Sequence, residues 1–485
     1  MNIRFGEESA TGAATVCPVY SGEPSPYRLR GKSAQASAVT WLLGRTEEEA
    51  DVLAVGMGAR SELTLERIRR AAGISARALM REGYRAARLR EPAAAPDSIG
   101  AAGISEADWL QAWLEGWLFG LYRFDAFREA TRTEGTVDLL LSPGDWQGLS
   151  LPELERIAAF ARSRNDGVAL ARDLVNEPPD VLDPQRFTAW AERYFSLMDG
   201  PVNVHVYRGE ELREKQMNGL IAVGAGGGEP ALVEIRYEGD PDQPMLALVG
   251  KGVTFDMGGM NVKTGRDISD ARMDMGGAAA VAGAMDILIR ERAKVNVTAL
   301  IPIADNLPGS GAMLPSSVIR YPNGLTVQVA NTDGEGRLII ADALILAANI
   351  GASEAIDIAT LTGNVGAALG LGIAGIWGDA GIAKELVAIG ERNGERLWPM
   401  PLMDEYEAEL RSDYADLRNV SSSTMAGAIT AALFIRRFVT KPMKWVHIDM
   451  AGTVQYKQDA GYAEAGATGY GVRLLADYAV KRAKG

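Results

Sequence analysis

The order of apolar and polar residues divides most of the chain into alternating strand-like and helix-like segments. Six short apolar runs predict β-strands, and several are apolar throughout, as in strands buried on both faces. They are VNVHVY (202–207), PALVEIRY (230–237), MLALVG (245–250), VNVTALIPI (295–303), EAIDIATL (354–361) and KWVHIDMAG (444–452). Residues 277–293 and 337–348 have the apolar spacing of helices. The alternation predicts an α/β fold in which a central, mostly buried sheet is flanked by helices.

The beginning of the chain shows the same two patterns on a smaller scale. DVLAVGMGAR (51–60) predicts a strand that enters a glycine turn, and residues 63–90 have helical spacing. Ser105 and Asp108 form a capping box ahead of a third helix, whose repeated tryptophans we expect in a core rather than on a ligand face. REPAAAPDSIG (90–100) predicts a proline-rich connection.

A long helix is expected over residues 151–176, because Pro178 and Pro179 would end it. We place a domain boundary within this helix. The sequence therefore predicts two domains, a smaller N-terminal α/β domain over residues 1–165 and a larger C-terminal domain over residues 166–485.

Composition narrows the functions that the chain could have. Of 485 residues, 47% are hydrophobic and 23% are charged, an ordinary globular balance. The net charge of -13 argues against nucleic acid or an anionic membrane surface as the main partner, because both attract cations. Residues 358–378 are uncharged, but their six glycines favour a buried strand with tight turns over a membrane span.

The compartment is predicted from the single cysteine and from the first residues. Cys17 alone cannot form an internal disulfide, which fits a reducing compartment. MNIRFGEESATG lacks the basic and apolar regions of a signal peptide. We therefore expect a cytoplasmic protein.

Several familiar active-site patterns are excluded. The chain has two histidines, His205 and His447, so an HExxH zinc site cannot form, and no GxSxG elbow occurs. We expect both histidines to be structural, although a catalytic role for His447 beside Asp449 is conceivable. GAGGGE (224–229) lacks the third glycine of a dinucleotide fingerprint and predicts a turn or a close backbone approach.

Four carboxylates stand beside glycines in two segments of the C-terminal part. These are VGKGVTFDMGGMNVKTGRDISDARMDMGGAAA (249–280) and NTDGEGRLIIADAL (331–344). Asp256 follows an apolar run, whereas Asp274, Asp333 and Glu335 precede predicted helices. Such positions gather ligands in α/β folds, and clustered carboxylates repel one another unless cations lie among them. The pattern predicts a site for Mg²⁺, Mn²⁺ or Zn²⁺.

Helix capping is the alternative interpretation, because Asp and Asn at a helix N-terminus need no metal. Capping would explain any one of these residues. Four carboxylates interleaved with Lys251, Lys263 and Arg337 favour a site instead. Paired metals can generate hydroxide from water, so the residues by themselves predict a metal-dependent hydrolase.

The two segments resemble the signatures of the leucyl (cytosol) aminopeptidase family, peptidase family M17. The shared motifs are GKGxTFDxGG, the lysine seven residues after its aspartate, DMGGAA and NTDxEGRL. The resemblance extends from RDLVNEPPDVLDP (172–184) through ADNLPGSGA (304–312), ATLTG (359–363), ERLWPMPL (395–402) and WVHIDMAG (445–452) to GATGYGVR (466–473). The N-terminal part resembles the family loosely, mainly in GLYRFDAF (120–127). The resemblance implies that residues 166–485 form a catalytic peptidase domain.

Carried over residue by residue, the resemblance implies two divalent ions per subunit, zinc or manganese first and magnesium or cobalt as alternatives. Lys251, Asp256, Asp274 and Glu335 would bind one ion. Asp256, Asp333 and Glu335 would bind the other, so that Asp256 and Glu335 bridge the pair. The lysine must be neutral to ligate, and a dication would lower its pKa accordingly.

The same resemblance implies the reaction, which is release of the N-terminal residue, leucine or another apolar one, by a water that the two metals activate. Lys263 would stabilise the oxyanion. Arg337 would hold bicarbonate as general base, because its planar fork matches that anion. Thr360, Gly363 and Ala451 match positions of the family's side-chain pocket. Substrates would be peptides with a free N-terminus, and the family typically forms a homohexamer.

Some positions depart from the family pattern. Met257, Gly334 and Gln328 stand where serine, alanine and glutamate are usual, and none of them is a ligand position. Ala271 stands where several members carry a methionine that floors the side-chain pocket. We therefore predict a roomier pocket and a shifted residue preference.

Three alternatives remain at this point. Some family members bind DNA as architectural proteins, a role that the acidic balance disfavours as the main one here. A different two-metal hydrolase, such as a phosphatase, is disfavoured by the ordered lysine and arginine positions. A catalytically inactive scaffold is disfavoured because every ligand and catalytic position of the family carries the expected residue.

Overall fold

The computed structural model describes residues 3–6, 12–46, 49–90, 103–129, 135–146, 148–265 and 267–483. The chain forms two compact units, residues 1–165 with 457–465 and residues 166–456 with 466–485. The division between the units falls inside helix α4 (Leu151–Asn176). The segment 457–465 belongs to the first unit, whereas the sequence division placed it in the C-terminal domain. Nearly all of the predicted connection 90–100 lies outside the described residues.

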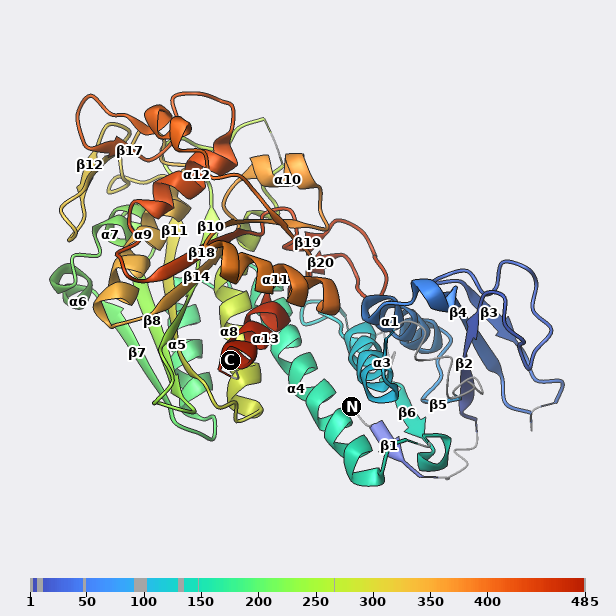
Figure 1. Cartoon of the computed structure of the whole chain (residues 1–485). Coiled ribbons are helices and arrows are strands. Elements are labelled where there is room, and N and C mark those ends of the chain that lie inside the picture. Colours follow the sequence, from blue (N-terminus) through green and yellow to red (C-terminus); the bar gives the residue numbers. More distant parts are fainter. Residues whose placement is uncertain are drawn as a thin grey trace. The chain divides into compact units, whose positions relative to one another are not determined.

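The first unit contains a six-stranded sheet among its described residues (Figure 1). Its order is β1 (Ile3–Phe5), β6 (Asp138–Leu141), β5 (Ala86–Leu89), β2 (Ala14–Tyr20), β4 (Val52–Gly58) and β3 (Val39–Leu42). The unit also contains α1 (Leu65–Arg81), α3 (Glu106–Leu121), η1 (Arg60–Glu62) and η3 (Pro143–Asp145).

The helix expected over residues 63–90 is too long. It ends at Arg81, and Gly83 follows with φ +81°, a left-handed conformation that glycine adopts without strain. Residues 86–89 then pair with β2 and β6 as a strand. The core position of the tryptophans is confirmed, because Trp109, Trp113 and Trp117 are at most 2% exposed.

The second unit is built on a nine-stranded sheet. Its order is β16 (Leu397–Pro399), β15 (Ala374–Gly378), β18 (Lys444–Asp449), β14 (Glu354–Ala359), β9 (Leu246–Gly250), β11 (Asn296–Asn306), β8 (Ala231–Glu238) and β7 (Val202–Arg208), with β10 (Gly252–Asp256) paired to β11. The four adjacent strands β18, β14, β9 and β11 run parallel. The six strands expected from the sequence are therefore all present, and they share one sheet.

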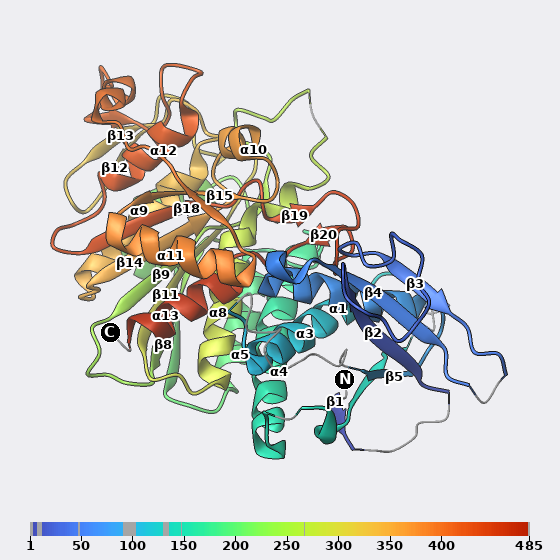
Figure 2. The same ribbon diagram turned by 45° about the vertical axis from the view of Figure 1, so that its right-hand side comes forward.

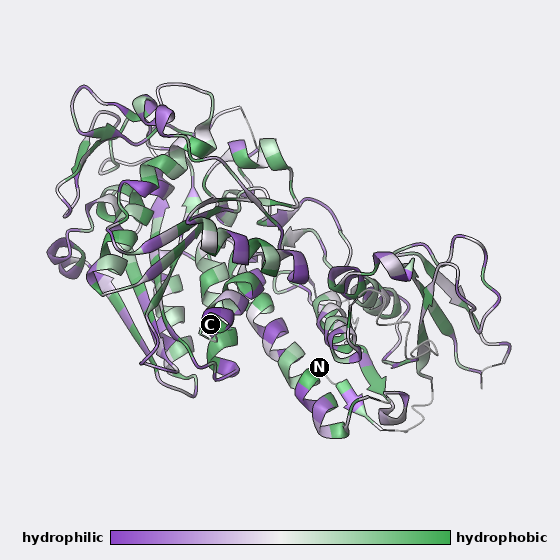
Figure 3. Cartoon of the chain, viewed as in Figure 1, coloured by the Kyte–Doolittle hydropathy of each residue, from purple (hydrophilic) through white to green (hydrophobic). Residues whose placement is uncertain are grey.

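Helices cover both faces of this sheet, as the α/β pattern predicts (Figure 1, Figure 2). Besides part of α4, the described helices of this unit are α5 (Pro184–Ser196), α6 (Glu210–Glu214), α7 (Asn218–Gly224), α8 (Gly276–Arg290), α9 (Glu335–Asn349), α10 (Gly363–Leu369), α11 (Ala380–Asn393), α12 (Gly427–Arg436) and α13 (Val472–Arg482). Hydrophobic residues run along the strands and through α12, whereas the short α6 is hydrophilic (Figure 3). No helix among the described residues is long and apolar enough to cross a membrane.

Smaller elements complete the second unit near the ends of the parallel strands. The described residues there form two short sheets, one of β12 (Val318–Arg320), β13 (Thr326–Gln328) and β17 (Leu417–Arg418) and one of β19 (Gln455–Tyr456) and β20 (Gly466–Ala467). Two 3-10 helices, η4 (Ala271–Met275) and η5 (Asp404–Leu410), lie in the connections. Segment 358–378 forms the end of β14, the short helix α10 and β15 rather than a single span.

Candidate metal centre

The carboxyl ends of the central strands and the first turns of two helices meet at one place. Lys251 lies between β9 and β10, and Asp256 is the last residue of β10. Asp274 belongs to η4 directly before α8, and Glu335 is the first residue of α9. Because carboxyl ends of parallel strands share one edge of a sheet, residues more than 80 positions apart in the sequence come together.

Lys251 is the inner cation of this cluster. Its Nζ lies 2.6 Å from Asp274 Oδ2 and 2.8 Å from Glu335 Oε1, and it donates a 2.9 Å hydrogen bond to the carbonyl of Thr360. The side chain is 2% exposed. Gly336 makes this packing possible, because a Cβ at that position would lie 2.6 Å from the Cε of Lys251.

Lys263 is the outer cation. Its Nζ lies 2.7 Å from Asp256 Oδ2 and also contacts the carboxylate of Asp333. The loop that carries Lys263 turns at Gly258, whose φ is +87°, and a Cβ there would lie 2.9 Å from Asp333 Oδ1. Glycine is therefore needed at this position for both backbone conformation and close approach.

The electrostatics of the cluster show that it holds an excess of buried negative charge. Burial raises the pKa of Asp274 well above its usual range, and Lys251 offsets part of that shift. Burial and the neighbouring Asp256 likewise raise the pKa of Glu335 and of Asp333. Burial alone would lower the pKa of Lys251, but the surrounding carboxylates raise it above its usual value. Four carboxylates thus share two lysines.

These residues fit a divalent metal ion. Asp256, Asp333 and Glu335 can each bring a ligand oxygen within 4.8 Å of the others. Carboxylate oxygens suit Mg²⁺, Mn²⁺ and Zn²⁺, and dications would relieve the repulsion that raises these pKa values. A neutral Lys251 amine is also a chemically suitable ligand once a cation replaces its charge.

Arg337 lies in the first turn of α9 and is buried. Its Nη1 donates a 2.9 Å hydrogen bond to the carbonyl of Asn419, and burial lowers its pKa to about 10. Among the described residues its Nε has no hydrogen-bond partner. An incompletely bonded, buried guanidinium fits a small planar anion.

All eleven residues assigned to the site from the sequence line one cavity of about 610 Å³. Ala271, Thr360, Gly363 and Ala451 lie along its wall, together with Met273 and Val454, which the sequence argument did not name. The volume lies within the usual range of small-molecule sites. What each residue does there stays a prediction at this point.

A buried asparagine, Asn306, lies between the carboxylates and was not predicted from the sequence. Asn306 Nδ2 donates hydrogen bonds to Asp256 Oδ1 at 2.9 Å, to the Thr332 carbonyl at 3.1 Å and to Glu335 Oε2 at 3.4 Å. Asn306 ends β11 within the motif ADNLPGSGA, so its place beside the acidic segments was visible. Its contact with two carboxylates was not, because it depends on strand pairing.

Neither histidine is among the described residues that line this cavity. His447 Nδ1 lies 2.5 Å from Oδ1 of Asp357, and the other carboxylate oxygen of Asp357 accepts a hydrogen bond from Trp445 Nε1. The side chains of His447 and Asp357 are both fully buried. The partner of His447 is thus Asp357, and not Asp449, which stands two residues from it in the sequence. His205 lies on β7 beside Glu211. The glycine-rich GAGGGE makes a close backbone approach, because a Cβ on Gly226 would lie 2.2 Å from the Leu307 carbonyl oxygen.

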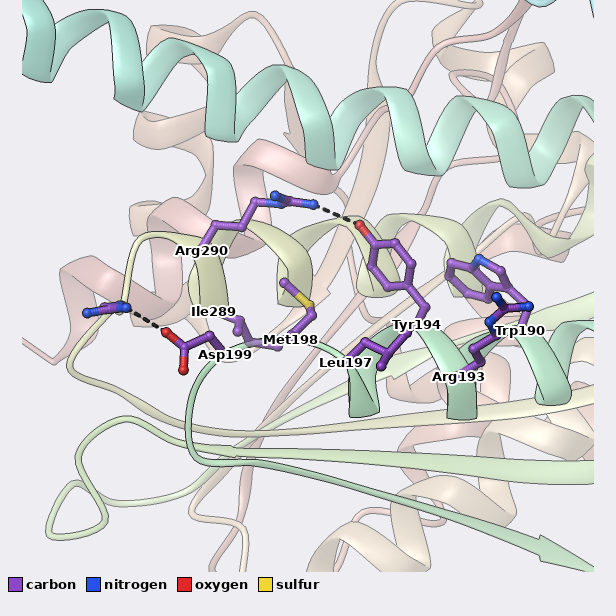
Figure 4. Close-up of a pocket in the computed structure, with 9 residues that line it drawn as sticks. Trp190, Arg193, Tyr194, Leu197, Met198, Asp199, Ile289 and Arg290 are labelled. Atoms are coloured by element: carbon purple, nitrogen blue, oxygen red, sulfur yellow. Dashed lines mark hydrogen bonds and ion pairs between the residues drawn. The ribbon is translucent and has the colours of Figure 1, made fainter.

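A second cavity of about 620 Å³ lies between α5 and the end of α8 (Figure 4). Tyr194 and Trp190 stack along it with ring centroids 5.3 Å apart. Arg290 is held by Asp286 and by the Tyr194 hydroxyl, and Arg292 pairs with the exposed Asp199. No group of acidic, histidine or cysteine residues suited to a metal was found here among the described residues.

Family models match both parts of the chain. The catalytic domain of the cytosol aminopeptidase family matches residues 169–476, and the N-terminal domain of the same family matches residues 28–131. The "Probable cytosol aminopeptidase" of Syntrophotalea carbinolica is 39% identical over 439 residues, which cover 88% of this chain and 85% of that protein. That of Geobacter sulfurreducens is 39% identical over 440 residues, 90% of this chain and 86% of that protein.

Solved structures also match over nearly the whole chain. The bottromycin maturation enzyme BotP superposes with a TM-score of 0.86 at 32% identity and covers 98% of this chain and 100% of its own. BotP in complex with Mn superposes with a TM-score of 0.87, also at 32% identity, and covers 97% of this chain and 100% of its own.

Proposed function

The chain belongs to the cytosol aminopeptidase family, a family of metal-dependent exopeptidases, and on that premise we propose a two-metal reaction on peptides with an apolar N-terminal residue. The observation that carries the proposal is the cluster of four carboxylates and two lysines at the carboxyl ends of the central strands, in which the carboxylate of Asp333 is the most exposed and the others are largely buried. A site with this much negative charge needs cations, and a Mn complex of the related BotP supports a divalent one.

Two divalent ions would supply a water activated for attack and charge neutralisation at the scissile carbonyl. Lys251, Asp256, Asp274 and Glu335 would hold one ion, and Asp256, Asp333 and Glu335 the other. Zinc or manganese is our first assignment, and magnesium and cobalt are alternatives. Thr360 orients Asp274 for this role, because its hydroxyl donates a 2.8 Å hydrogen bond to Asp274 Oδ1.

Lys263 and Arg337 would act on the reacting atoms without binding metal. Lys263 is the outer cation of the cluster, with a side chain that is 10% exposed, and would stabilise the negative charge that develops on the carbonyl oxygen. Arg337 would hold a bicarbonate ion that supplies a general base. Its guanidinium is buried, and no described residue bonds its Nε, which supports an anion at this position.

The wall of small residues would receive the side chain of the N-terminal residue. Ala271, Thr360, Gly363 and Ala451 line the cavity and favour leucine and other apolar residues. Because Ala271 is small, we expect the pocket to admit larger side chains than a methionine floor would. Comparing kcat/KM for leucine, methionine and aromatic amides between the wild type and Ala271→Met tests this, and unchanged ratios would refute it.

The central experiment uses metal-free protein and two matched peptides. Chelation should abolish hydrolysis of a leucine-initiated peptide, and addition of Mn²⁺ or Zn²⁺ should restore it. The same peptide with an acetylated N-terminus should stay intact, because no free amino group can bind. Hydrolysis that survives metal removal, or equal cleavage of the blocked peptide, would reject the proposal. Metal content after purification identifies the physiological ion.

Cellular context and assembly complete the proposal. The relatives are named cytosol aminopeptidases, which supports a cytoplasmic location. We also propose a homohexamer, from the habit of the family. Sedimentation velocity would test the assembly, and a stable monomer at micromolar concentration would contradict it.

A further inference from the structure

One asparagine that lies outside every motif quoted above contacts, at several points, the loop that carries Asp333. Asn419 follows β17, which pairs in parallel with β13, and it is fully buried. Residues 329–334 connect β13 to α9 and carry Asp333. The next residue, Glu335, begins α9.

The side-chain amide of Asn419 is fully bonded to that loop. Oδ1 accepts hydrogen bonds from the backbone N–H groups of Ala330 at 2.8 Å and Asn331 at 3.3 Å. Nδ2 donates to the carbonyls of Asn331 at 2.6 Å and Gly334 at 3.3 Å. A carboxamide offers two donors and two acceptor positions, so none of its capacity remains for other partners.

The backbone of the same residue reaches two further elements. Its N–H donates to the carbonyl of Gln328 at 3.0 Å, which fixes it to the end of β13. Its carbonyl accepts the 2.9 Å hydrogen bond from Arg337 Nη1, which ties this guanidinium to a segment outside α9. A displacement of Asn419 therefore displaces both the loop and the arginine.

We propose that Asn419 is a positioning residue that fixes the metal-binding loop (residues 329–334) relative to Arg337. This inference rests on the proposed function, in which Asp333 and Glu335 hold metal and Arg337 holds the anion. The site needs loop 329–334 and Arg337 at a fixed separation, because hydrogen bonds that support ligand-bearing segments strongly affect metal affinity. A single residue that is hydrogen-bonded to both the loop and Arg337 fixes that separation.

A purely stabilising role is the competing explanation, since any buried, fully bonded amide contributes to folding. Asn393 supplies a matched control in the same unit. It is 4% exposed, its Nδ2 donates to Asp477 at 3.2 Å and its Oδ1 accepts from the N–H of Glu395 at 3.1 Å. It ends α11, which contributes no residue to the catalytic cavity among the described residues.

The test compares Asn419→Ala, Asn419→Ser and Asn393→Ala with the wild type. Calorimetric titration of each metal-free protein with Mn²⁺ measures affinity without activity, and we expect at least tenfold weaker binding in the Asn419 variants. Asn393→Ala should bind within twofold of the wild type even where its melting temperature falls. Hydrogen exchange of peptides spanning 330–334 should accelerate in the Asn419 variants alone, because two of these amides lose their acceptor.

A second readout concerns Arg337. The bicarbonate concentration that half-maximally stimulates hydrolysis should rise at least threefold in the Asn419 variants and stay constant in Asn393→Ala. Equal losses of Mn²⁺ affinity in the Asn419 and Asn393 variants would overturn the inference, as would a folded Asn419→Ala that binds Mn²⁺ like the wild type. Failure of both Asn419 variants to fold would assign the residue to stability and overturn it too. A wild type that binds no metal would instead refute the proposed function.

Discussion

The two cavities described in the second unit are nearly equal in volume, about 610 and 620 Å³, yet their charged side chains differ in how far they are exposed to solvent. In the proposed catalytic cavity the charged side chains of Lys251 and Glu335 are buried, with exposed fractions of 2% and 3%. In the cavity of Figure 4, the ion pair between Arg292 and Asp199 is 78% and 86% exposed. The two cavities therefore differ not in volume but in the burial of their charged groups, which costs desolvation free energy in the first cavity.

The comparison also separates what each cavity can still bind. Arg290 in the second cavity is bonded to Asp286 at 2.8 and 3.0 Å and to Tyr194, so its charge is already matched. The proposed catalytic cavity holds four carboxylates against two lysines, and Arg337 Nε has no hydrogen-bond partner within the part of the chain that the structure describes. A cavity whose buried charges outnumber their partners favours the binding of further ions, whereas a cavity whose charges are already paired does not.

The largest difference should come from the same carboxylate-to-amide change in both cavities. Glu335→Gln removes a charge that we assign to both metal ions, and kcat/KM should fall about 10³-fold or more, equivalent to roughly 4 kcal/mol of transition-state stabilisation. Asp199→Asn, at the second cavity, should leave kcat/KM within twofold. Steady-state kinetics and metal content on the purified variants measure both. Loss of activity in Asp199→Asn would break the comparison.

A second difference concerns folding of the metal-free protein. Lys251→Met leaves Asp274 and Glu335 without their nearest cation, and removing one partner of a buried pair costs about 3–5 kcal/mol. Denaturant unfolding in the presence of chelator should show this loss. Mn²⁺ should restore part of it, because a dication replaces the missing charge. A metal-free variant as stable as the wild type would show that the carboxylates protonate and need no cation.

The same contrast explains how much the sequence revealed. The parallel sheet and its flanking helices were predictable because strands 245–250 and 295–303 are apolar on both faces. The acidic residues were predictable because glycines and carboxylates stand together in two short segments. Their assembly into one cavity followed from the rule that parallel strands open at a common edge.

What the sequence could not give depends on contacts between distant segments. Asn306 and Asn419 approach Glu335 and Gly334 only after β11 and β17 have found their partners, and neither lies in an acidic segment. The helix expected to reach residue 90 failed for a related reason. The local spacing favoured a helix, but pairing of residues 86–89 with β2 and β6 overrode it.

A third and smaller difference should appear in the pH dependence of stability. Burial by itself lowers the pKa of His447, but its contact with Asp357 raises it above the usual 6.5. A raised folded-state pKa gives stability that is fully present below pH 6.5 and is lost as pH rises through the folded value. Melting temperature should therefore fall over that window in the wild type and fall less in Asp357→Asn. Identical pH profiles would show that His447 does not titrate there.

The smallest effect is expected at the rim of the second cavity, at Arg292. Substituting Arg292→Gln breaks an exposed ion pair, so the free energy of unfolding should change by less than about 0.5 kcal/mol. Arg292→Gly should instead stabilise slightly, by up to about 1 kcal/mol, because the residue follows the end of α8 at φ +49° and closes a left-handed cap in which glycine is favoured. Both variants should keep wild-type kcat/KM. Denaturant unfolding and steady-state kinetics on both variants test this. A change in kcat/KM on substitution of this exposed arginine would mean that the second cavity is energetically coupled to the proposed catalytic cavity.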